Sequence, residues 1–198
     1  MPDIRSFIAI ELPGTIQEKL EQVIKDLRSQ GTLPIRWVPS RNIHLTLKFL
    51  GDVPEEQLES IGQMLGEEAA CHQPFEIRIS KLGAFPNALK PRVIWLGIEK
   101  STVLGELQQS IEEGTISLGF PRENRRFHPH LTLGRVKRNA SHRDIKEISL
   151  MLNEQEITNL AVVQVDSVCL FRSDLRPGGA VYSILSTANL QRAKEQRV

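Results

Sequence analysis

The sequence has few cysteines and no long apolar run. Its two cysteines, Cys71 and Cys169, are too few for the disulfide framework of a small secreted protein or for a cysteine-based metal site, so we expect both to be reduced thiols. No segment approaches the ~20 apolar residues of a membrane-spanning helix. The N-terminus also lacks a basic stretch followed by an apolar one. These absences predict a cytoplasmic protein without a membrane partner.

A strong charge of either sign is also absent. The chain carries 25 Lys and Arg residues against 24 Asp and Glu residues, a formal net charge of +1. Such a balance provides no overall attraction to nucleic acid or to an acidic membrane, so any anion site must be local. With 198 residues, of which 40% are hydrophobic, the chain is long enough for one full core or two fused half-domains.

One short motif occurs twice. His44-Leu45-Thr46-Leu47 returns as His130-Leu131-Thr132-Leu133. Phe171 follows Phe85 by the same number of residues as His130 follows His44. Because internal repeats indicate duplicated structural units, we expect residues 1–198 to form a single bilobal domain with one motif in each lobe.

Strand-like and helix-like segments are mixed along the chain. Strands are expected at 6–12, 43–50, 75–82, 92–98, 161–171 and 180–186, and at the second motif. Helices are expected to begin near Thr15, Pro54, Ser101 and Ser141, with Thr15, Ser101 and Ser141 as N-caps. The pattern predicts an α+β fold of two pseudo-twofold-related lobes, each a mostly antiparallel sheet backed by helices, with a central cleft.

The strand that carries the first motif alternates with a period of two. This alternation predicts that the core face of the strand carries Ile43, Leu45, Leu47 and Phe49. The opposite face would carry His44, Thr46 and Lys48. His44 and Thr46 would then project side by side, about 7 Å apart along the strand.

Two histidines that face each other across a cleft can act as an acid and a base, since histidine exchanges a proton near neutral pH. In-line displacement at phosphorus needs both, one for the attacking oxygen and one for the departing oxygen. Thr46 and Thr132 could donate hydrogen bonds to phosphate oxygens, and Arg135 or Lys48 could add positive charge. This arrangement requires no metal and no cofactor.

At these motifs the sequence resembles the two-histidine (HxTx) phosphoesterases, specifically the RNA 2′,3′-cyclic phosphodiesterases, which are also named 2′-5′ RNA ligases. The resemblance spans essentially the whole chain. It is carried by Phe7-Ile8-Ala9-Ile10, Trp37-Val38, His44-Leu45-Thr46-Leu47-Lys48-Phe49-Leu50-Gly51 and Phe127-His128-Pro129-His130-Leu131-Thr132-Leu133-Gly134-Arg135.

The resemblance implies hydrolysis of an RNA 2′,3′-cyclic phosphate to a 2′-phosphate. His44 would be the proton donor to the leaving 3′ oxygen, and His130 the proton acceptor that activates water. The resemblance implies that the phosphate is held by Thr46, Thr132 and Arg135. Phe49 is a candidate substrate-binding residue, which would support the base or belong to the core. Some members of the family join RNA ends through a 2′-5′ bond by the reverse of the same chemistry.

Two other functions fit the same residues. The chain could be a module that binds RNA ends or nucleotides without turnover. It could also be a metal-dependent phosphoesterase that uses His128 and His130, although no nearby Asp, Glu or Cys completes a ligand set. Support of the motif strand is the interpretation of His128 that we favour.

Cations cluster around the second motif. They are Arg122, Arg125, Arg126, Arg135, Lys137 and Arg138. The cluster is either a solvated edge or a track for an RNA backbone, and we favour the track because the rest of the chain is balanced in charge. Arg126 is therefore a candidate substrate-binding residue. The expected partner is RNA with a 2′,3′-cyclic phosphate terminus, with tRNA fragments among the candidates, and the expected state is a monomer.

Overall fold

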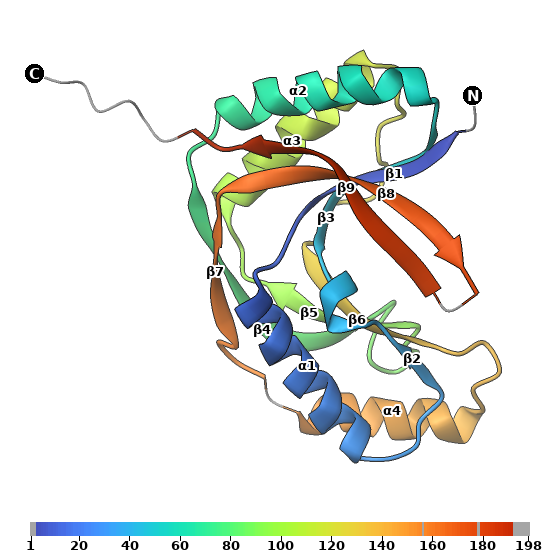
Figure 1. The fold of residues 1–198 in the computed structure, drawn as a ribbon. Helices are drawn as coiled ribbons and strands as arrows, with labels where there is room; N and C mark the ends of the chain where they lie inside the picture. The colour runs from blue at the N-terminus through green and yellow to red at the C-terminus, as the bar shows by residue number, and fades with distance from the viewer. Residues whose placement is uncertain (1–2, 156, 178, 192–198) are drawn as a thin grey trace, which may run out of the picture.

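The computed structural model describes residues 3–155, 157–177 and 179–191. It contains two antiparallel sheets with helices packed against them (Figure 1), which confirms the predicted α+β architecture. Sheet A has the strand order β3 (Leu45–Val53), β1 (Ile4–Ile10), β8 (Ser167–Arg176), β9 (Gly179–Asn189). Sheet B has the order β2 (Ile35–Trp37), β6 (His130–Val136), β5 (Val93–Ile98), β4 (Phe75–Phe85), β7 (Ala161–Val165).

The two sheets repeat one pattern of neighbours. In sheet A, β1 lies between β3 and β8, and β9 lies beyond β8; in sheet B, β5 lies between β6 and β4, and β7 lies beyond β4. The histidine motifs belong to the corresponding strands β3 and β6. Strand β2 is an addition at the edge of sheet B and lies outside the strand segments expected from the sequence.

Two of the helices cover the sheet that does not contain the strand before them. The α-helices are α1 (Gly14–Ser29), α2 (Leu58–Ala70), α3 (Thr102–Ser117) and α4 (His142–Glu154), and short 3-10 helices are η1 (Ser40–Asn42) and η2 (Glu55–Gln57). Figure 1 shows α2 and α3 beside sheet A, and α1 and α4 beside sheet B. Helix α1 therefore follows a strand of sheet A but covers sheet B, whereas α3 follows a strand of sheet B but covers sheet A.

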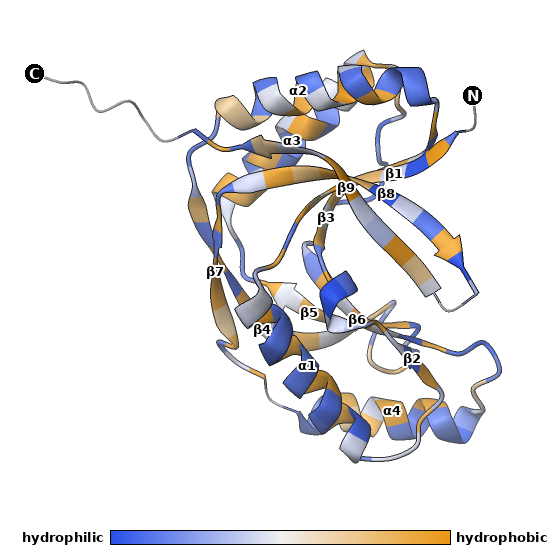
Figure 2. Ribbon diagram, in the orientation of Figure 1, coloured by the Kyte–Doolittle hydropathy of each residue, from blue (hydrophilic) through white to orange (hydrophobic). Residues whose placement is uncertain are grey.

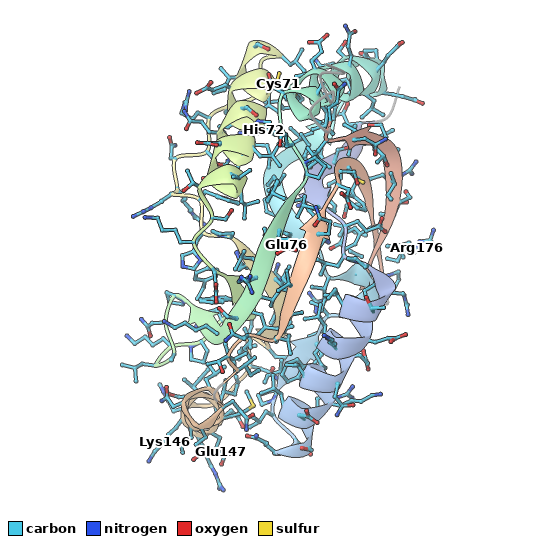
Figure 3. All side chains as sticks on the ribbon, turned by 90° about the vertical axis from the view of Figure 1, so that its left-hand side faces the viewer. Cys71, His72, Glu76, Lys146, Glu147 and Arg176 are labelled. Carbon is cyan, nitrogen blue, oxygen red and sulfur yellow. The ribbon has the colours of Figure 1, made fainter. Side chains whose placement is uncertain are left out.

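The helices present an apolar side to the sheets and a polar side to water (Figure 2). Fully buried side chains such as Leu20, Leu65 and Leu107 join one continuous core that includes residues of both sheets. On the outer side of α4, Lys146 and Glu147 are visible in Figure 3. In the described part of the chain, no helix is both long and apolar enough to cross a membrane.

Two of the three predicted helix caps are confirmed. The side chain of Ser101 accepts a hydrogen bond from the backbone N–H of Leu104, and Ser141 forms a capping box with Asp144. The prediction for Thr15 is wrong, because Pro13 occupies the N-cap position and Gly14 starts the helix without a side-chain cap. Proline suits this boundary because its fixed φ lies in the helical range and it has no N–H to leave unpaired.

The single strand predicted over 161–171 is wrong. The chain instead breaks between β7, which ends at Val165, and β8, which begins at Ser167. These two strands belong to different sheets. Both segments are rich in apolar residues, so composition alone could not reveal that the chain passes from one sheet to the other. The two cysteines are free, as predicted; Figure 3 shows Cys71 at the end of α2.

A buried ion pair joins sheet A to the segment before the second motif. Lys48 and Glu112 are each only 5% exposed, and their charged atoms lie 2.6 Å apart. The Lys48 ammonium also donates to the carbonyl oxygen of Pro121 at 2.7 Å, while the Glu112 carboxylate accepts from the backbone N–H of Glu123 at 2.7 Å. The pair thus connects β3, α3 and the segment that leads to β6.

Removal of one partner should destabilise the fold strongly. We expect Lys48→Met to lower the free energy of unfolding by about 3–5 kcal/mol, because the Glu112 carboxylate would remain buried without its cation. The double variant Lys48→Met, Glu112→Leu should regain most of that loss. Urea denaturation of both variants measures the difference. Lys25→Met, at an exposed position of α1, is the control and should stay within about 0.5 kcal/mol; an equally small effect of Lys48→Met would contradict the argument.

Candidate active site

The first motif lies where β3 pairs with β1. His44 directly precedes β3, and Thr46 is opposite Ala9 in the neighbouring strand. Phe7 stacks on the ring of His44, with ring centroids 4.6 Å apart. Because directly opposed residues project from the same face of a sheet, Thr46 and Ala9 share one face, and Phe7 lies on that face two residues before Ala9. We call it the site face of sheet A.

The second motif repeats this geometry in sheet B. His130 begins β6, and Thr132 is opposite Trp95 of β5. The ring of Phe85, from β4, meets His130 edge to face with centroids 4.9 Å apart. The face that carries Thr132 and Trp95 is the site face of sheet B. Phe85 and Phe171, noted in the sequence only as a repeated landmark, therefore each lie beside the histidine of their own sheet.

A bulge interrupts both motif strands at equivalent positions. In β3, Thr46 and Lys48 pair with consecutive residues of β1, so Leu47 is the extra residue. In β6, Thr132 and Gly134 pair with consecutive residues of β5, so Leu133 is the extra one. A bulge places two residues opposite one and shifts the alternation of side chains between faces. Both strands accordingly show the same order of burial over the five residues that follow the histidine.

The bulge overturns the predicted position of Lys48. It pairs with Ile8, on the face of sheet A opposite Thr46, and binds Glu112 of α3 in the interior. The structure therefore does not bring Lys48 to the two histidines. Strict alternation, which would have kept Lys48 beside Thr46, fails because Leu47 occupies an additional position.

The same shift exposes Phe49 and Arg135. The strand alternation placed Phe49 on the core face, which is wrong, since the residue is 67% exposed; its candidacy for substrate binding stays a prediction. It lies opposite Phe7 with ring centroids 6.2 Å apart, on the site face. Arg135 is the equivalent residue of β6 and is exposed. Arg135 lies near enough to His130 for its positive charge to lower the pKa of that imidazole.

Both histidine rings are held by the same backbone contact. The Nδ1 atom of His44 lies 2.9 Å from the carbonyl oxygen of Asn42, and that of His130 lies 2.7 Å from the carbonyl oxygen of His128. A carbonyl oxygen only accepts, so Nδ1 must carry the proton in each ring. The Nε2 atom of each histidine is then free to accept a proton or, once protonated, to donate one. His128 thus contributes its backbone, which fits the supporting role favoured from the sequence.

An aromatic enclosure lowers the proton affinity of His44. Phe7 and Phe171 stack on its ring, and Tyr182 meets it edge to face at 5.1 Å. Burial lowers the pKa of His44 to about 4; its hydrogen bond to Asn42 acts in the opposite direction, and His130 lowers it further. The coupling between the two histidines indicates that the motifs of the two sheets lie close together.

The surroundings of His130 are more open. Burial lowers its pKa, the bond to the His128 carbonyl raises it, and the charges of His128 and Arg135 lower it. The ring of Trp95 lies beside the rings of both His128 and His130. It also packs against strand β4. A side chain at Gly83 would come within 2.3 Å of the Trp95 ring, so glycine is needed there for the ring to lie against the sheet.

These residues form what we call the two-histidine site. It consists of His44, Thr46, His130, Thr132 and Arg135. Arg126 is exposed in the segment before β6, and within the described residues no ion pair joins it to the site. Among the described residues, no three His, Cys, Asp or Glu side chains cluster as they would around a metal ion. The arrangement provides two proton-exchanging nitrogens, two hydroxyls and one fixed cation, a set suited to transfer at a phosphate.

The sequence did not reveal that the aromatic rings of Phe7, Trp95 and Tyr182 lie against the two histidines. They are far from the motifs along the chain, and each lies in an ordinary strand pattern. Two other aromatic neighbours of the histidines, Phe85 and Phe171, did give a signal in the sequence, because their spacing matches that of the histidines.

Comparisons with known proteins agree with the geometry. The family model described as "LigT like Phosphoesterase" matches residues 10–95 and again residues 96–182. The RNA 2′,3′-cyclic phosphodiesterase of Methanothermobacter thermautotrophicus is 33% identical over 94% of this chain and 99% of its own length. The enzyme of the same name from Archaeoglobus fulgidus is 35% identical over 92% of this chain and 98% of its own length.

A solved structure has the same fold. The crystal structure of E. coli LigT complexed with 3′-AMP is similar with a TM-score of 0.75 and 26% sequence identity, and the match covers 97% of this chain and all of that one (100%).

The enclosure of His44 leads to a prediction that can be tested without substrate. In an NMR titration the His44 pKa should be about 4. Tyr182→Ala uncovers one edge of the ring, so the pKa should rise toward the ordinary value of 6.5, because water then stabilises the imidazolium. Val181→Ala, at the neighbouring position on the other face of β9, should leave it unchanged. Assignment uses the resonances lost in His44→Gln, and an ordinary pKa in the unmodified protein would refute the effect of burial.

Proposed function

The chain belongs to the LigT-like phosphoesterase family, and from this we propose that it hydrolyses the 2′,3′-cyclic phosphate at the end of an RNA to a 2′-phosphate. The observation that carries the proposal is the matched pair of histidines at the start of equivalent strands, each with Nδ1 bound to a backbone carbonyl and with no hydrogen bond at Nε2 from the described residues. The names of relatives that match along nearly the whole chain support the same activity.

The reaction follows from the two Nε2 atoms. Neutral His130 accepts a proton from water as the water oxygen attacks phosphorus. The bond from phosphorus to the 3′ oxygen breaks, and protonated His44 gives its Nε2 proton to that oxygen. A 2′-phosphate and a 3′-hydroxyl result, with His44 neutral and His130 protonated. Exchange of one proton with solvent restores the starting state, so the cycle consumes only water and requires no metal.

The remaining site residues stabilise the charge that develops on the phosphate. The hydroxyls of Thr46 and Thr132 donate to the non-bridging oxygens from the two sides, and Arg135 supplies a fixed positive charge. Such donors lower the barrier because they are already oriented when charge accumulates. Phe49, exposed beside Phe7, offers an apolar surface to the substrate.

The two histidines have different surroundings. Burial among aromatic rings lowers the pKa of His44 to about 4, so His44 is neutral in the free protein near neutral pH. The donor role therefore requires that His44 gain a proton when the substrate binds, and a bound phosphate anion favours that charged form. His130 is more open and lies beside Arg135, as suits a base that meets water.

The same site could use an alcohol in place of water. A 5′-hydroxyl of a second RNA that attacks the cyclic phosphate would form a 2′-5′ bond, and the reverse step would break it. RNA fragments with cyclic phosphate ends, such as those cut from tRNA, are substrates of the required chemistry.

Substitution of either histidine tests the proposal. His44→Ala and His130→Ala should each lower turnover of an RNA ending in a 2′,3′-cyclic phosphate by about 10²–10⁴-fold, since each removes a proton-transfer group. Affinity for the RNA should persist, and the unmodified protein should yield a 2′-phosphate, also in excess chelator. His142→Ala, on exposed α4, is the control. A 3′-phosphate product would contradict the assigned roles, and a protein that binds the RNA without turnover would be an RNA-end-binding module.

The pH dependence follows from the lowered histidine pKa values. Burial favours the neutral imidazoles and so brings both below the ordinary 6.5. The pH profile of kcat/KM reports the free enzyme. We expect a bell-shaped profile in which both limbs report the titration of the coupled histidine pair. The midpoint of its alkaline limb should lie below about pH 6.5. In the complex, the phosphate charge should raise both pKa values and move the kcat profile to higher pH. A kcat/KM profile that is flat from acid to alkaline pH would exclude two-histidine catalysis.

A further inference from the structure

Arg36 lies beside the two-histidine site on the edge strand β2. It is directly opposite Arg135 in the pairing of β2 with β6. Residues directly opposite each other in antiparallel strands project from the same face, with Cβ atoms about 5 Å apart. Arg36 therefore shares the site face of sheet B with Arg135, and both side chains are exposed.

This pairing of like charges is unfavourable in the protein alone. Two cations directly opposite each other in a sheet repel. Within the described ranges, neither Arg36 nor Arg135 forms an ion pair with a carboxylate. An anion bound between or beside them would relieve the repulsion, so the arrangement favours a phosphate-rich ligand.

The cations continue past the end of the strands. The backbone N–H of Lys137 donates to the carbonyl oxygen of Pro34 at 2.8 Å, so the pairing of the two segments extends beyond Val136. Lys137 is exposed, and strand alternation places it on the same side as Arg135. The three cations thus form one exposed group: Arg36 lies across the sheet from Arg135, and Lys137 lies farther along the chain from Arg135.

We propose that Arg36 forms a second phosphate subsite, which binds the phosphodiester on the 5′ side of the terminal nucleotide while Arg135 holds the cyclic phosphate. This inference rests on the proposed function. Arg36 is one strand farther from His130 than Arg135 is, about 5 Å outward across the sheet, so it meets the next phosphate of the chain rather than the reacting one. Lys137 then lies along the continuing RNA backbone.

The subsite determines the class of substrate. A nucleoside 2′,3′-cyclic phosphate has no second phosphate and gains nothing from Arg36. An oligoribonucleotide with the same terminal nucleoside gains a charge-assisted contact, so the enzyme prefers RNA ends to mononucleotides. The preference is independent of base sequence, because the contact is to the backbone.

The test compares these two substrates in Arg36→Gln. For the oligoribonucleotide, KM should rise roughly tenfold with kcat unchanged, and the slope of log KM against log salt should fall by about 0.7, the contribution of one phosphate contact to a single strand. For the nucleoside cyclic phosphate, both constants should remain unchanged. Arg36→Lys should retain part of the affinity. Arg28→Gln removes an exposed arginine from the last turn of α1 and should affect neither substrate.

Direct binding separates failure of the subsite from failure of the proposed function. Affinities for the oligoribonucleotide with a 2′-phosphate end and for the matching nucleoside 2′-phosphate are measured in parallel by titration. A tenfold loss confined to the oligoribonucleotide supports the subsite even if the unmodified protein hydrolyses neither cyclic phosphate. Equal losses on both ligands would show that Arg36 acts at the reacting phosphate and overturn the subsite, as would no loss on either.

Discussion

A bulge at the same position of each motif strand is the constraint on which the site depends. Leu47 and Leu133 are the extra residues of equivalent bulges, and each moves the next side chain to the helix-covered face and the one after it to the site face. In β3 the result is a buried Lys48 and an exposed Phe49; in β6 it is a buried Gly134 and an exposed Arg135. The same bulge in the two strands therefore places an aromatic side chain on the site face of sheet A and a cation on the site face of sheet B.

Opposing forces act on the two histidines in the same way. Burial withdraws water from each ring and lowers its pKa, while the backbone carbonyl that binds Nδ1 stabilises the charged form. The carbonyl also determines which nitrogen faces the substrate. The balance differs between the sheets, since three aromatic rings contact His44. The site is thus symmetric in geometry and asymmetric in the surroundings of its two imidazoles.

Much of this structure could be predicted from the sequence, since the repeated motif and its strand pattern led to two antiparallel sheets with a histidine from each. The predictions that were wrong concern features that depend on pairing between strands far apart in the sequence. Alternation alone placed Lys48 beside Thr46, because a bulge depends on the register with β1 and leaves no local signal. Composition alone joined 161–171 into one strand, because apolar residues do not reveal which sheet they enter. Arg36 gained importance only when β2 was found beside β6.

Because elements of the two repeats are interleaved, the surroundings of the two histidines can become different from each other. Each sheet contains strands from both halves of the chain, and α1 and α3 each cover the sheet to which their preceding strand does not belong (Figure 1). Half of the chain alone would leave apolar faces open, and two identical halves could close them only as a symmetric dimer with equivalent histidines. Covalent fusion removes that equivalence, so that the residues around each histidine can change independently.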